Sequence, residues 1–474
     1  RDGDCGAIGV AMTPMGPVIM GIHTLGHQRT AGFPHVTRTQ LLAVMEDDVA
    51  QISAGAAPLL SLNGVALEPI HHKSVLRYIP EGTARVYGSL PGARPKPRSR
   101  VCATPLQQEM LEHFGGEVEH GAPVMTGWEP VYKNIVEMVK PDTNIDQTLL
   151  DHCVEAYTRD VLDGLQQEHG DSWKGELVYL SDEAAVNGLP GVKFIDGINR
   201  GTSMGHPWHG PKKRHLEPYI TEDYPEGVQF SEEIRARVAE IKSLYAEGKR
   251  AYPVFTAHLK DEAVPQAKID AKKTRVFTGA PVDWSIVVRS RTLAFIRLLQ
   301  KNKLIFEAAP GTVAQSIEWT QFYDYLTAHG KDQIIAGDYS KFDKHMIPAF
   351  VIAAYKVIAN VYPAAGFTEQ ELRDLACIAL DTAFPLTNVN GDMIEFNGTN
   401  PSGHPCTVIV NSIVNSLYMR YAFCELNPEE RTCWKFKKVV NLLTYGDDNG
   451  PGVSKRTPWF NHTAVQKTLA TIGV

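Results

Sequence analysis

The sequence predicts an α+β fold with more than one domain or subdomain. Its 474 residues, 43% of them hydrophobic, are enough to bury a large core. Two short apolar runs, at 332–338 and 438–443, each end at a turn that carries acidic residues and predict strands. Apolar residues at intervals of three and four predict helices within 128–170, over 231–248 and over 406–423.

Charge and cysteine content limit the class of protein. The formal net charge of −7 argues against a uniformly basic surface, but it permits a basic channel because net charge averages over all faces. The seven cysteines are scattered, odd in number and without metal-ligand spacing, which fits a reducing compartment and argues against a zinc ribbon or a disulfide framework. They lie at positions 5, 102, 153, 377, 406, 424 and 433.

The start of the chain and its apolar runs were searched for membrane spans and targeting signals. No apolar run approaches the length of a membrane span. The start, Arg1-Asp2-Gly3-Asp4-Cys5, predicts neither a signal peptide nor an initiator methionine. We therefore expect the chain to begin inside a longer protein.

The first 52 residues carry a cysteine and a histidine in settings that suggest chemistry. Cys5 lies among glycines, which lets backbone N–H groups converge on a carbonyl oxygen beside the sulfur. His23 lies in a strand-like run over 17–26. Taken singly, each is equally well explained as a packed core residue. Residues 53–70 are small and irregular and predict a linker; a cleavage site after a glutamine such as Gln51 stays open.

Two basic segments precede the acidic ones. Prolines, glycines and basic residues over 71–105 predict an extended arm, either a solvated loop or an RNA-facing one. Residues 256–278 predict a hairpin with a bend near Pro265, and its cations suit a triphosphate or a nucleic-acid backbone. Alone, a solvated charged hairpin explains this segment better. Its basic residues are Lys260, Lys268, Lys272, Lys273 and Arg275.

Acidic residues cluster at two predicted strand ends. Asp338 ends the strand at 332–338, and Asp343 follows one turn later, before a helix that begins near Pro348. Asp447 and Asp448 lie at the tip of a predicted hairpin; adjacent carboxylates repel each other, so a cation is their natural companion. A solvated turn and an ordinary acid at a helix N-terminus are the simpler alternatives.

A loop over 397–405 leads into the helix over 406–423. In that helix Thr407, Asn411, Asn415 and Tyr418 recur every three or four residues and share one face. Apolar residues flank this polar stripe, and asparagine and serine are poor helix formers. We therefore expect the stripe to be buried or to face a ligand.

Taken together and in this order, these motifs resemble the finger and palm motifs of picornavirus-like RNA-dependent RNA polymerases, over about residues 70–474. The sequence over 400–405 and 414–420 is most similar to that of marnavirus- and dicistrovirus-type enzymes. The motifs are Lys260-Asp261-Glu262 to Lys273-Thr274-Arg275, Asp338-x4-Asp343, Ser402-Gly403-x3-Thr407-x3-Asn411-Ser412, and Tyr445-Gly446-Asp447-Asp448.

The start of the chain resembles a second family, the chymotrypsin-like cysteine proteases of the same polyproteins. By that resemblance Cys5 is the nucleophile and His23 lines the pocket for the substrate's P1 side chain. The catalytic histidine and acid of that family would lie upstream of Arg1. A thiol without its base is poorly activated, so we expect no working protease here.

The resemblance implies an α+β right-hand polymerase fold with fingers and palm, the thumb largely missing, preceded by a partial protease β-barrel. We expect protease sequence at 1–52, a linker at 53–70 and polymerase at 71–474. The implied fingers are 71–330 and 344–402, and the implied palm is 331–343 and 403–474. Because the chain ends before the family's thumb and a lysine that is its probable general acid, we expect poor primer extension.

The resemblance also assigns roles to the site residues. Asp338 and Asp447 would hold two Mg²⁺ ions, which Mn²⁺ can replace, with Asp448 in support. The triphosphate would be gripped by Lys260, Lys268 and Arg275. The ribose 2′-hydroxyl would be read by Asp343, Thr407 and Asn411. Ser402 and Gly403 would let their loop move as the template advances.

The activity that follows is RNA-templated RNA synthesis from ribonucleoside triphosphates. Implied partners are an RNA template and primer, other viral replication proteins and a protein primer, at membrane-associated replication complexes in the host cytoplasm. The alternatives are a reverse transcriptase, a protease fragment and an RNA-binding module. Reverse transcriptases usually place a bulky aromatic residue where Asp343 lies, and an RNA-binding module needs no pair such as Asp338 and Asp447.

Overall fold

The computed structural model divides into two compact units, Arg1–Gly64 and Val65–Val474. It describes four strands of the first unit and, in the second, residues 67–70, 74–79, 84–92, 97–127, 129–139 and 145–474. The predictions for Cys5, for His23 and for most of the linker lie outside the described residues. They stay predictions.

The first unit contains two short antiparallel pairs. Strand β1 (Ile8–Thr13) pairs with β2 (Gly16–Ile22), and β3 (Leu25–His27) pairs with β4 (Thr30–Gly32). The strand-like run predicted over 17–26 therefore contributes to both pairs. Membership of a protease barrel stays a prediction.

The second unit contains a five-stranded sheet with the order β11-β9-β12-β13-β5. Only β9 and β12 are parallel neighbours; the other pairs are antiparallel. The predicted basic hairpin over 256–278 is confirmed as the pair β9–β11, with Thr278 opposite Ala257. The strands are β5 (Ala84–Ser89), β9 (Val254–Leu259), β11 (Val276–Gly279), β12 (Leu386–Val389) and β13 (Asp392–Phe396).

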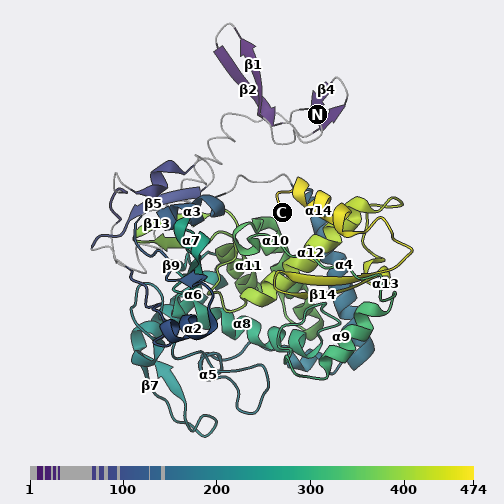
Figure 1. Ribbon diagram of the computed structural model, residues 1–474. Coiled ribbons are helices and arrows are strands. Elements are labelled where there is room, and N and C mark those ends of the chain that lie inside the picture. Colours follow the sequence, from purple (N-terminus) through teal and green to yellow (C-terminus); the bar gives the residue numbers. More distant parts are fainter. Residues whose placement is uncertain are drawn as a thin grey trace. The chain divides into compact units, whose positions relative to one another are not determined.

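Helices are the main regular elements described in the second unit, and the predicted ones are present (Figure 1). The region 128–170 forms two helices, α3 and α4. The α-helices are α2 (Gln107–Phe114), α3 (Glu129–Met138), α4 (Gln147–His169), α5 (Asp182–Asn187), α6 (Glu232–Ala246), α7 (Gln266–Asp270), α8 (Val282–Lys301), α9 (Glu318–Thr327), α10 (Pro348–Val361), α11 (Glu369–Ala383), α12 (Thr407–Leu426), α13 (Phe436–Val439) and α14 (His462–Thr471).

Local sequence explains where several helices begin. The Asp146 carboxylate accepts the Leu149 N–H at the start of α4, and Asn461 caps α14 in the same way. Thr368 and Glu371 form a capping box at the start of α11. Ser231 occupies the predicted N-cap position of α6, but its side chain makes no capping bond.

Three short strand pairs complete the described unit. The hairpin β14–β15 lies against α12 and carries the predicted acidic tip; the other two pairs are β7–β8 and β6–β10. The strands are β6 (His120–Gly121), β7 (Leu216–Pro218), β8 (Val228–Phe230), β10 (Val264–Pro265), β14 (Val440–Tyr445) and β15 (Asp448–Val453). Lys438 and Val439, predicted as strand, belong to the short helix α13 instead.

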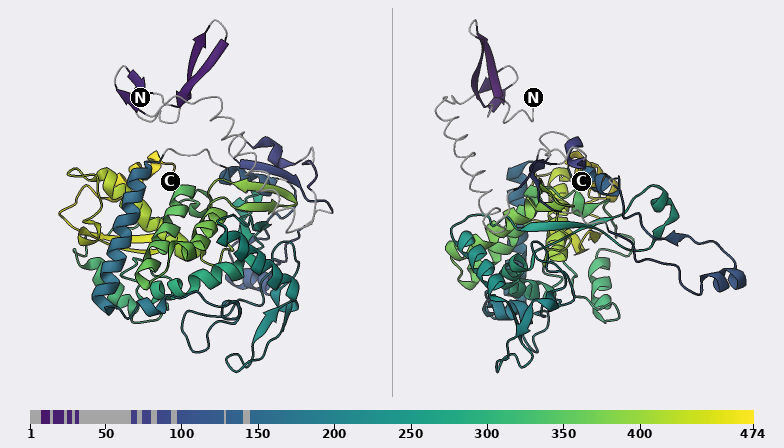
Figure 2. Two further views of the ribbon diagram at one scale, coloured as in Figure 1. Left: turned by 180° about the vertical axis from the view of Figure 1, so that it is seen from behind. Right: turned by 90° about the vertical axis from the view of Figure 1, so that its left-hand side faces the viewer.

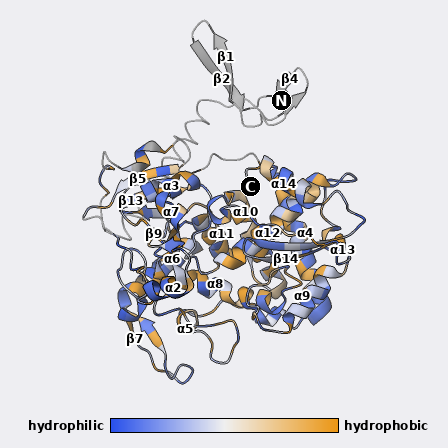
Figure 3. Ribbon diagram, viewed as in Figure 1, coloured by the Kyte–Doolittle hydropathy of each residue, from blue (hydrophilic) through white to orange (hydrophobic). Residues whose placement is uncertain are grey.

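Helix α12 forms the centre of the core. Every residue from 409 to 424 is buried, so the helix is covered on all sides by α4, α10, α14 and β14. Colouring by hydropathy shows how much of α10 and α12 is apolar (Figure 3). Three of the four residues of the polar stripe on α12 are buried: Asn411 is 5% exposed, Asn415 0% and Tyr418 1%, whereas Thr407 is half-buried.

The segment 332–338 differs from the prediction of a buried strand. It touches β15 through isolated antiparallel bridges, Ile334 with Gly452 and Gly337 with Asn449. Ile334 is 40% exposed. The apolar run suggested that the side chains of this segment would be buried. Within the described residues, the segment bridges β15 along one edge, and none of residues 332–338 is buried. The prediction of burial was wrong.

Two further segments bear on the surroundings of the site. One helical stretch, Pro348–Ala365, is long and apolar enough to cross a membrane by length and composition, contrary to the expectation from sequence. It packs against α4, α11 and α12, and half of it is buried. By contrast, α2 has no buried residue and lies away from the helices around α12 (Figure 2).

Candidate active site

The hairpin β14–β15 places two carboxylates at its tip. Tyr445 pairs with Asp448, so Gly446 and Asp447 form the two-residue turn. Gly446 has φ +65°, in the left-handed region that glycine enters without steric cost. The side chains of Asp447 and Asp448 are exposed. The tip therefore presents both acids to solvent or to a ligand.

A buried asparagine on α12 holds this tip in place. The Asn415 Nδ2 amide lies 3.1 Å from the carbonyl oxygen of Gly446, 2.9 Å from that of Asp447 and 3.2 Å from that of Asp448. Its Oδ1 accepts a hydrogen bond of 3.2 Å from the Tyr339 hydroxyl. One side chain thus connects the hairpin tip to the residue that follows Asp338.

Ser412, one turn before Asn415, supports the same turn. Its hydroxyl oxygen accepts the Gly446 N–H at 2.9 Å and donates to the Val408 carbonyl at 2.7 Å. The Thr444 hydroxyl lies 3.2 Å from the Ser412 carbonyl. These bonds fix the backbone of the turn from the side of α12.

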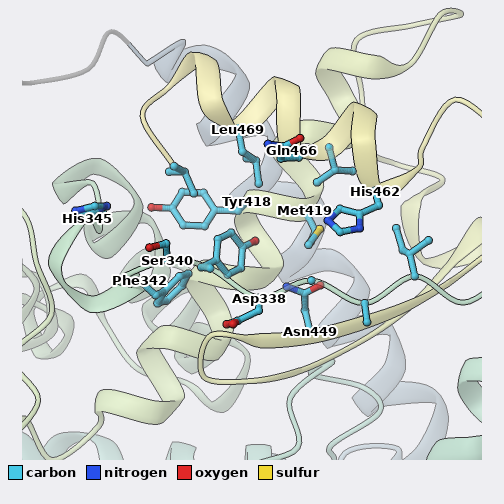
Figure 4. Close-up of a pocket in the computed structure, with 16 residues that line it drawn as sticks. Asp338, Ser340, Phe342, His345, Tyr418, Met419, Asn449, His462, Gln466 and Leu469 are labelled. Atoms are coloured by element: carbon cyan, nitrogen blue, oxygen red, sulfur yellow. The ribbon is translucent and has the colours of Figure 1, made fainter. Parts of the chain in front are cut away.

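The structure brings Asp338 next to the hairpin. Because Gly337 bridges Asn449 in an antiparallel sense, Asp338 follows at the level of Asp448. Figure 4 shows Asp338 and Asn449 side by side, next to a cavity of about 290 Å³ that reaches α14. In the described part of the chain, the carboxylates of Asp338, Asp447 and Asp448 have no hydrogen-bond or ion-pair partner.

The donor set of these three residues fits a hard divalent cation. All three are exposed carboxylates on neighbouring backbone segments, and oxygen ligands are those that Mg²⁺ prefers. None of them is neutralised by a lysine or arginine within the described ranges.

Asp343 lines the same cavity as Asp447 of the hairpin tip and belongs to a one-turn 3₁₀ helix (Phe342–Lys344). Its Oδ1 accepts a 2.7 Å hydrogen bond from Asn411 Nδ2, and Asn411 Oδ1 accepts a 2.6 Å bond from Asn400. Burial raises the pKa of the Asp343 carboxyl above its ordinary value, and the charge of Asp447 raises it further.

The Thr407 side chain does not join this hydrogen-bonded chain, although the Thr407 backbone carbonyl accepts from Asn400 Nδ2 at 3.4 Å. Its hydroxyl donates within its own loop, with the Pro401 carbonyl at 3.0 Å and the His404 carbonyl at 2.8 Å. The structure therefore connects two of the three residues predicted to read the sugar, Asp343 and Asn411. The third residue of the hydrogen-bonded chain is Asn400, which was not predicted as a site residue; its amide donates to Asn411 Oδ1.

The loop with Ser402 and Gly403 is fastened to strand β11. The Gly403 N–H donates to the Thr278 carbonyl at 2.6 Å, and the Ser402 N–H donates to the Thr278 hydroxyl at 3.1 Å. A Cβ atom on Gly403 would meet the Thr278 carbonyl oxygen at 2.6 Å. Glycine is required here by close backbone contact.

A neutral histidine, His404, holds the same loop through buried hydrogen bonds. The Cys406 N–H donates to His404 Nδ1 at 2.8 Å, so Nε2 carries the proton and faces the hydroxyls of Tyr355 at 2.8 Å and Thr382 at 3.1 Å. Burial lowers the pKa of His404 to about 3. Protonation of Nδ1 would break the bond to Cys406.

A larger cavity of about 670 Å³ adjoins Asp343, Asn400, Ser402 and Asp447. Seven of its lining side chains are cationic and three are acidic, so its walls carry a net charge of +4 in a chain whose net charge is −7. The cations are Lys133, Lys260, Lys268, Lys273, Arg275, Lys341 and Lys344.

The three residues predicted to bind triphosphate thus line one cavity. Two of them already have an acidic neighbour: Glu262 lies 2.8 Å from Lys260 and 3.3 Å from Arg275. Lys268 is exposed in α7. Asp338 borders the smaller cavity, whereas Gly403, Thr407 and Asp448 line neither of the two.

Comparison with known proteins shows which family the chain is similar to. The family model described as viral RNA-dependent RNA polymerase matches residues 122–473. The replicase polyprotein of Cricket paralysis virus is 31% identical over 312 residues, which cover 62% of this chain and 17% of the polyprotein. The RNA1 polyprotein of Beet ringspot virus is 26% identical over 351 residues, covering 70% of the chain and 15% of the polyprotein.

A solved structure gives the fold. The Sicinivirus 3Dpol RNA-dependent RNA polymerase superposes with a TM-score of 0.61 at 18% identity, covering 80% of this chain and 73% of that one. This likeness supports the predicted polymerase fold with mixed α and β structure. The chain spans less than a fifth of the polyproteins it matches. The family match covers most of the chain, and the chain belongs to the viral RNA-dependent RNA polymerase family.

Proposed function

We propose that the chain copies RNA from an RNA template, using ribonucleoside triphosphates, as part of a viral replicase. One observation carries this proposal: a single basic cavity contains Asp447 together with Asp343, whose carboxylate is hydrogen-bonded to Asn411. Such a cavity suits a triphosphate, and the paired amide and acid suit a ribose hydroxyl.

Asp338 and Asp447 would hold two Mg²⁺ ions, with Asp448 in support and Mn²⁺ as a substitute. When bound, the ions would supply positive charge that lowers the pKa of the primer 3′-hydroxyl and neutralises the leaving pyrophosphate. The contribution of the chain is to fix the carboxylates: Asn415 holds the backbone of Asp447 and Asp448 and bonds to Tyr339 beside Asp338.

Lys260, Lys268 and Arg275 would bind the triphosphate. In the unliganded protein Glu262 contacts two of these cations. A triphosphate would displace Glu262 from Lys260 and Arg275, because a polyanion offers more charge than one carboxylate. Thr278 and Ser402 line the same cavity, and the Ser402 N–H donates to the Thr278 hydroxyl.

Asp343 and Asn411 would recognise the sugar. A ribose 2′-hydroxyl can donate to the Asp343 carboxylate while accepting from the second amide proton of Asn411. Deoxyribose lacks this group, so this additional hydrogen bond to the half-buried Asp343 carboxylate would not form. This supports ribonucleotides over deoxyribonucleotides and so favours an RNA polymerase over a reverse transcriptase.

Primer extension on an RNA template with Mg²⁺ tests the proposal. The 474-residue chain would be compared with a form lengthened to include the thumb that the family resemblance leads us to expect. Asp338→Ala should abolish incorporation, because deletion of a catalytic group typically costs several orders of magnitude. Asp332→Ala is the matched control: this acid lies in the same segment and is exposed, and its carboxylate lies 3.7 Å from Lys455.

If both substitutions left incorporation intact, the metal role of Asp338 would be wrong. A folded, lengthened chain that incorporated no nucleotide would favour an RNA-binding role instead. Work at host cytoplasmic membranes with other viral replication proteins and a protein primer is part of the same proposal.

A further inference from the structure

Three cysteines and a histidine converge at a place remote from the predicted site residues. His152 and Cys153 belong to the second turn of α4, Cys424 lies in the last turn of α12, and Cys433 lies in the connection from α12 to α13. The spacing of these residues in the sequence does not predict the cluster, because 271 positions separate Cys153 from Cys424.

The ligand atoms of this cluster are close together. One nitrogen of the His152 ring and the sulfurs of Cys424 and Cys433 all lie within 4.8 Å of one another. The sulfurs of Cys153 and Cys424 are 3.9 Å apart. His152 Nε2 lies 3.1 Å from the Cys433 backbone nitrogen, so its lone pair points toward the residue that supplies the third sulfur.

These distances match a closed zinc site more nearly than a disulfide. Two thiolates bound tetrahedrally at about 2.3 Å from one zinc ion lie about 3.8 Å apart, whereas disulfide sulfurs lie about 2.05 Å apart. The limit of 4.8 Å between the ligand atoms of His152, Cys424 and Cys433 would close by about 1 Å around an ion. The ion would bind the lone pair of His152 Nε2, which accepts the Cys433 N–H in this structure.

A buried cation lies near the cluster. Cys153, Cys424 and Cys433 are each 0% exposed. The guanidinium of Arg420, itself fully buried, lies within electrostatic reach of Cys433 and forms ion pairs with Glu307 at 2.9 Å and Asp160 at 3.1 Å, while its Nε and Nη1 have no hydrogen-bond partner among the described residues. Three thiolates, a neutral histidine and Zn²⁺ have a net charge of −1, which the unpartnered edge of this guanidinium would partly offset.

We propose that His152, Cys153, Cys424 and Cys433 bind one structural zinc ion. The site would fasten the connection over 427–435 to α4. That connection lies between α12, which carries Asn415, and the hairpin β14–β15. Zinc would therefore stabilise the scaffold of the acidic hairpin without touching substrate. The inference does not depend on the proposed polymerase activity.

His152 is also held by a neighbour of the cluster. Its ring meets the ring of Trp434 edge-on, with centroids 4.7 Å apart, and the Arg159 guanidinium lies 3.8 Å from the Trp434 ring centre. Such contacts fix the orientation of an imidazole before a metal arrives, as outer partners of metal ligands commonly do.

Metal content of the full chain tests the proposal. The protein would be expressed with added zinc, purified without chelators under reducing conditions and measured by inductively coupled plasma mass spectrometry. We expect about one zinc ion per chain. Cys424→Ser and Cys433→Ser should lose it, whereas Cys377→Ser should keep it, because Cys377 is also buried but lies in α11, with its sulfur 3.9 Å from the Tyr245 carbonyl.

Cobalt gives a second readout that needs no substitution. Replacement of zinc by Co²⁺ in the wild-type chain should produce the visible absorption bands of a tetrahedral thiolate site, even if the serine variants fail to fold. Wild-type protein without zinc and with all its thiols reduced would overturn the proposal, since the cysteines would then be packed thiols. A Cys153–Cys424 disulfide, or zinc retained equally by the Cys424→Ser and Cys433→Ser variants, would overturn it as well.

Discussion

Replacement of Asn415 by alanine removes the connection between the two acid-bearing segments. The wild-type amide lies 2.9–3.2 Å from three carbonyl oxygens of the hairpin tip and accepts from the Tyr339 hydroxyl. Asn415 is 0% exposed, so water does not readily take its place. Asn415→Ala therefore removes this partner from the buried Gly446 carbonyl and from the partly buried carbonyls of Asp447 and Asp448.

The size of the effect follows from those contacts. Two amide protons serve the three carbonyls, and each buried group left unsatisfied costs about 1–3 kcal/mol, so we expect the free energy of unfolding to fall by about 2–4 kcal/mol. The larger effect should fall on catalysis. A shift of about 1 Å in the position of Asp447 relative to Asp338 would lower the rate about 100-fold.

Two measurements separate these effects. Urea unfolding gives the loss of stability, and single-nucleotide incorporation at saturating RNA gives the rate over a series of Mg²⁺ concentrations. We expect the rate to fall and the Mg²⁺ requirement to rise. Asn441→Ala is the control, since Asn441 lies in the same hairpin but its side-chain amide donates to the Tyr325 carbonyl, at 2.7 Å, and not to the hairpin tip. Wild-type rate and Mg²⁺ dependence in Asn415→Ala would refute the reasoning.

Three further substitutions test other parts of the site. Asp343→Ala should reduce the preference for ribonucleotides over deoxyribonucleotides about 10- to 100-fold, since a hydrogen bond to a charged group contributes about 1.5–3 kcal/mol; incorporation ratios measure this. Gly403→Ala should cost about 1–3 kcal/mol in urea unfolding and weaken nucleotide binding, because the new Cβ meets the Thr278 carbonyl oxygen at 2.6 Å. His404→Phe should reduce the loss of stability in acid. Burial lowers the pKa of His404 from 6.5 to about 3, so the unfolded chain binds the proton first and wild-type stability falls by about 1.4 kcal/mol per pH unit below pH 6.5.

Each of these has a matched comparison. Gly450→Ala should be nearly neutral, because a Cβ there meets nothing within 4 Å; equal losses at both glycines would contradict the close-contact argument. An unchanged sugar preference in Asp343→Ala would remove that residue from recognition. For His404 the difference between wild-type and variant is measured at pH 7.5 and pH 5.5, and a difference independent of pH would contradict the neutral, buried histidine.

The regular elements were largely predictable from the sequence because their signals are local. The helix over 406–423, the hairpin tip at Gly446 and the basic hairpin each depend on periodicity or turn residues that lie within one segment. The burial of 332–338 was not predictable in this way. An apolar run does not reveal whether one edge or two of the segment will be covered.

The predicted site residues gather where the motifs suggested, but their supporting contacts depend on tertiary structure. The polar stripe on α12 indicated that Asn415 would be buried, yet nothing local connected it to the tip at Asp447 or to Tyr339. Asn400 was likewise visible only as part of a loop, and its side-chain amide contacts both Asn411 and the Thr407 carbonyl. Hydrogen bonds between residues distant in sequence have no local signature.

The cysteine cluster illustrates the same limit more strongly. Sequence spacing excluded a zinc ribbon, but it could not show that α4 and the end of α12 bring Cys153 and Cys424 to 3.9 Å. The helices themselves were predictable from their apolar periodicity. Their packing, which creates the cluster, was not.

Sugar preference in template-directed incorporation tests the central claim most directly. The lengthened chain would extend an RNA primer on an RNA template with Mg²⁺, with ribonucleotides or deoxyribonucleotides, alongside Asp447→Ala. We predict incorporation of ribonucleotides only, lost in the variant. Equal use of deoxyribonucleotides would contradict sugar recognition by Asp343 and Asn411, and activity that survives in Asp447→Ala would contradict the role of the hairpin tip.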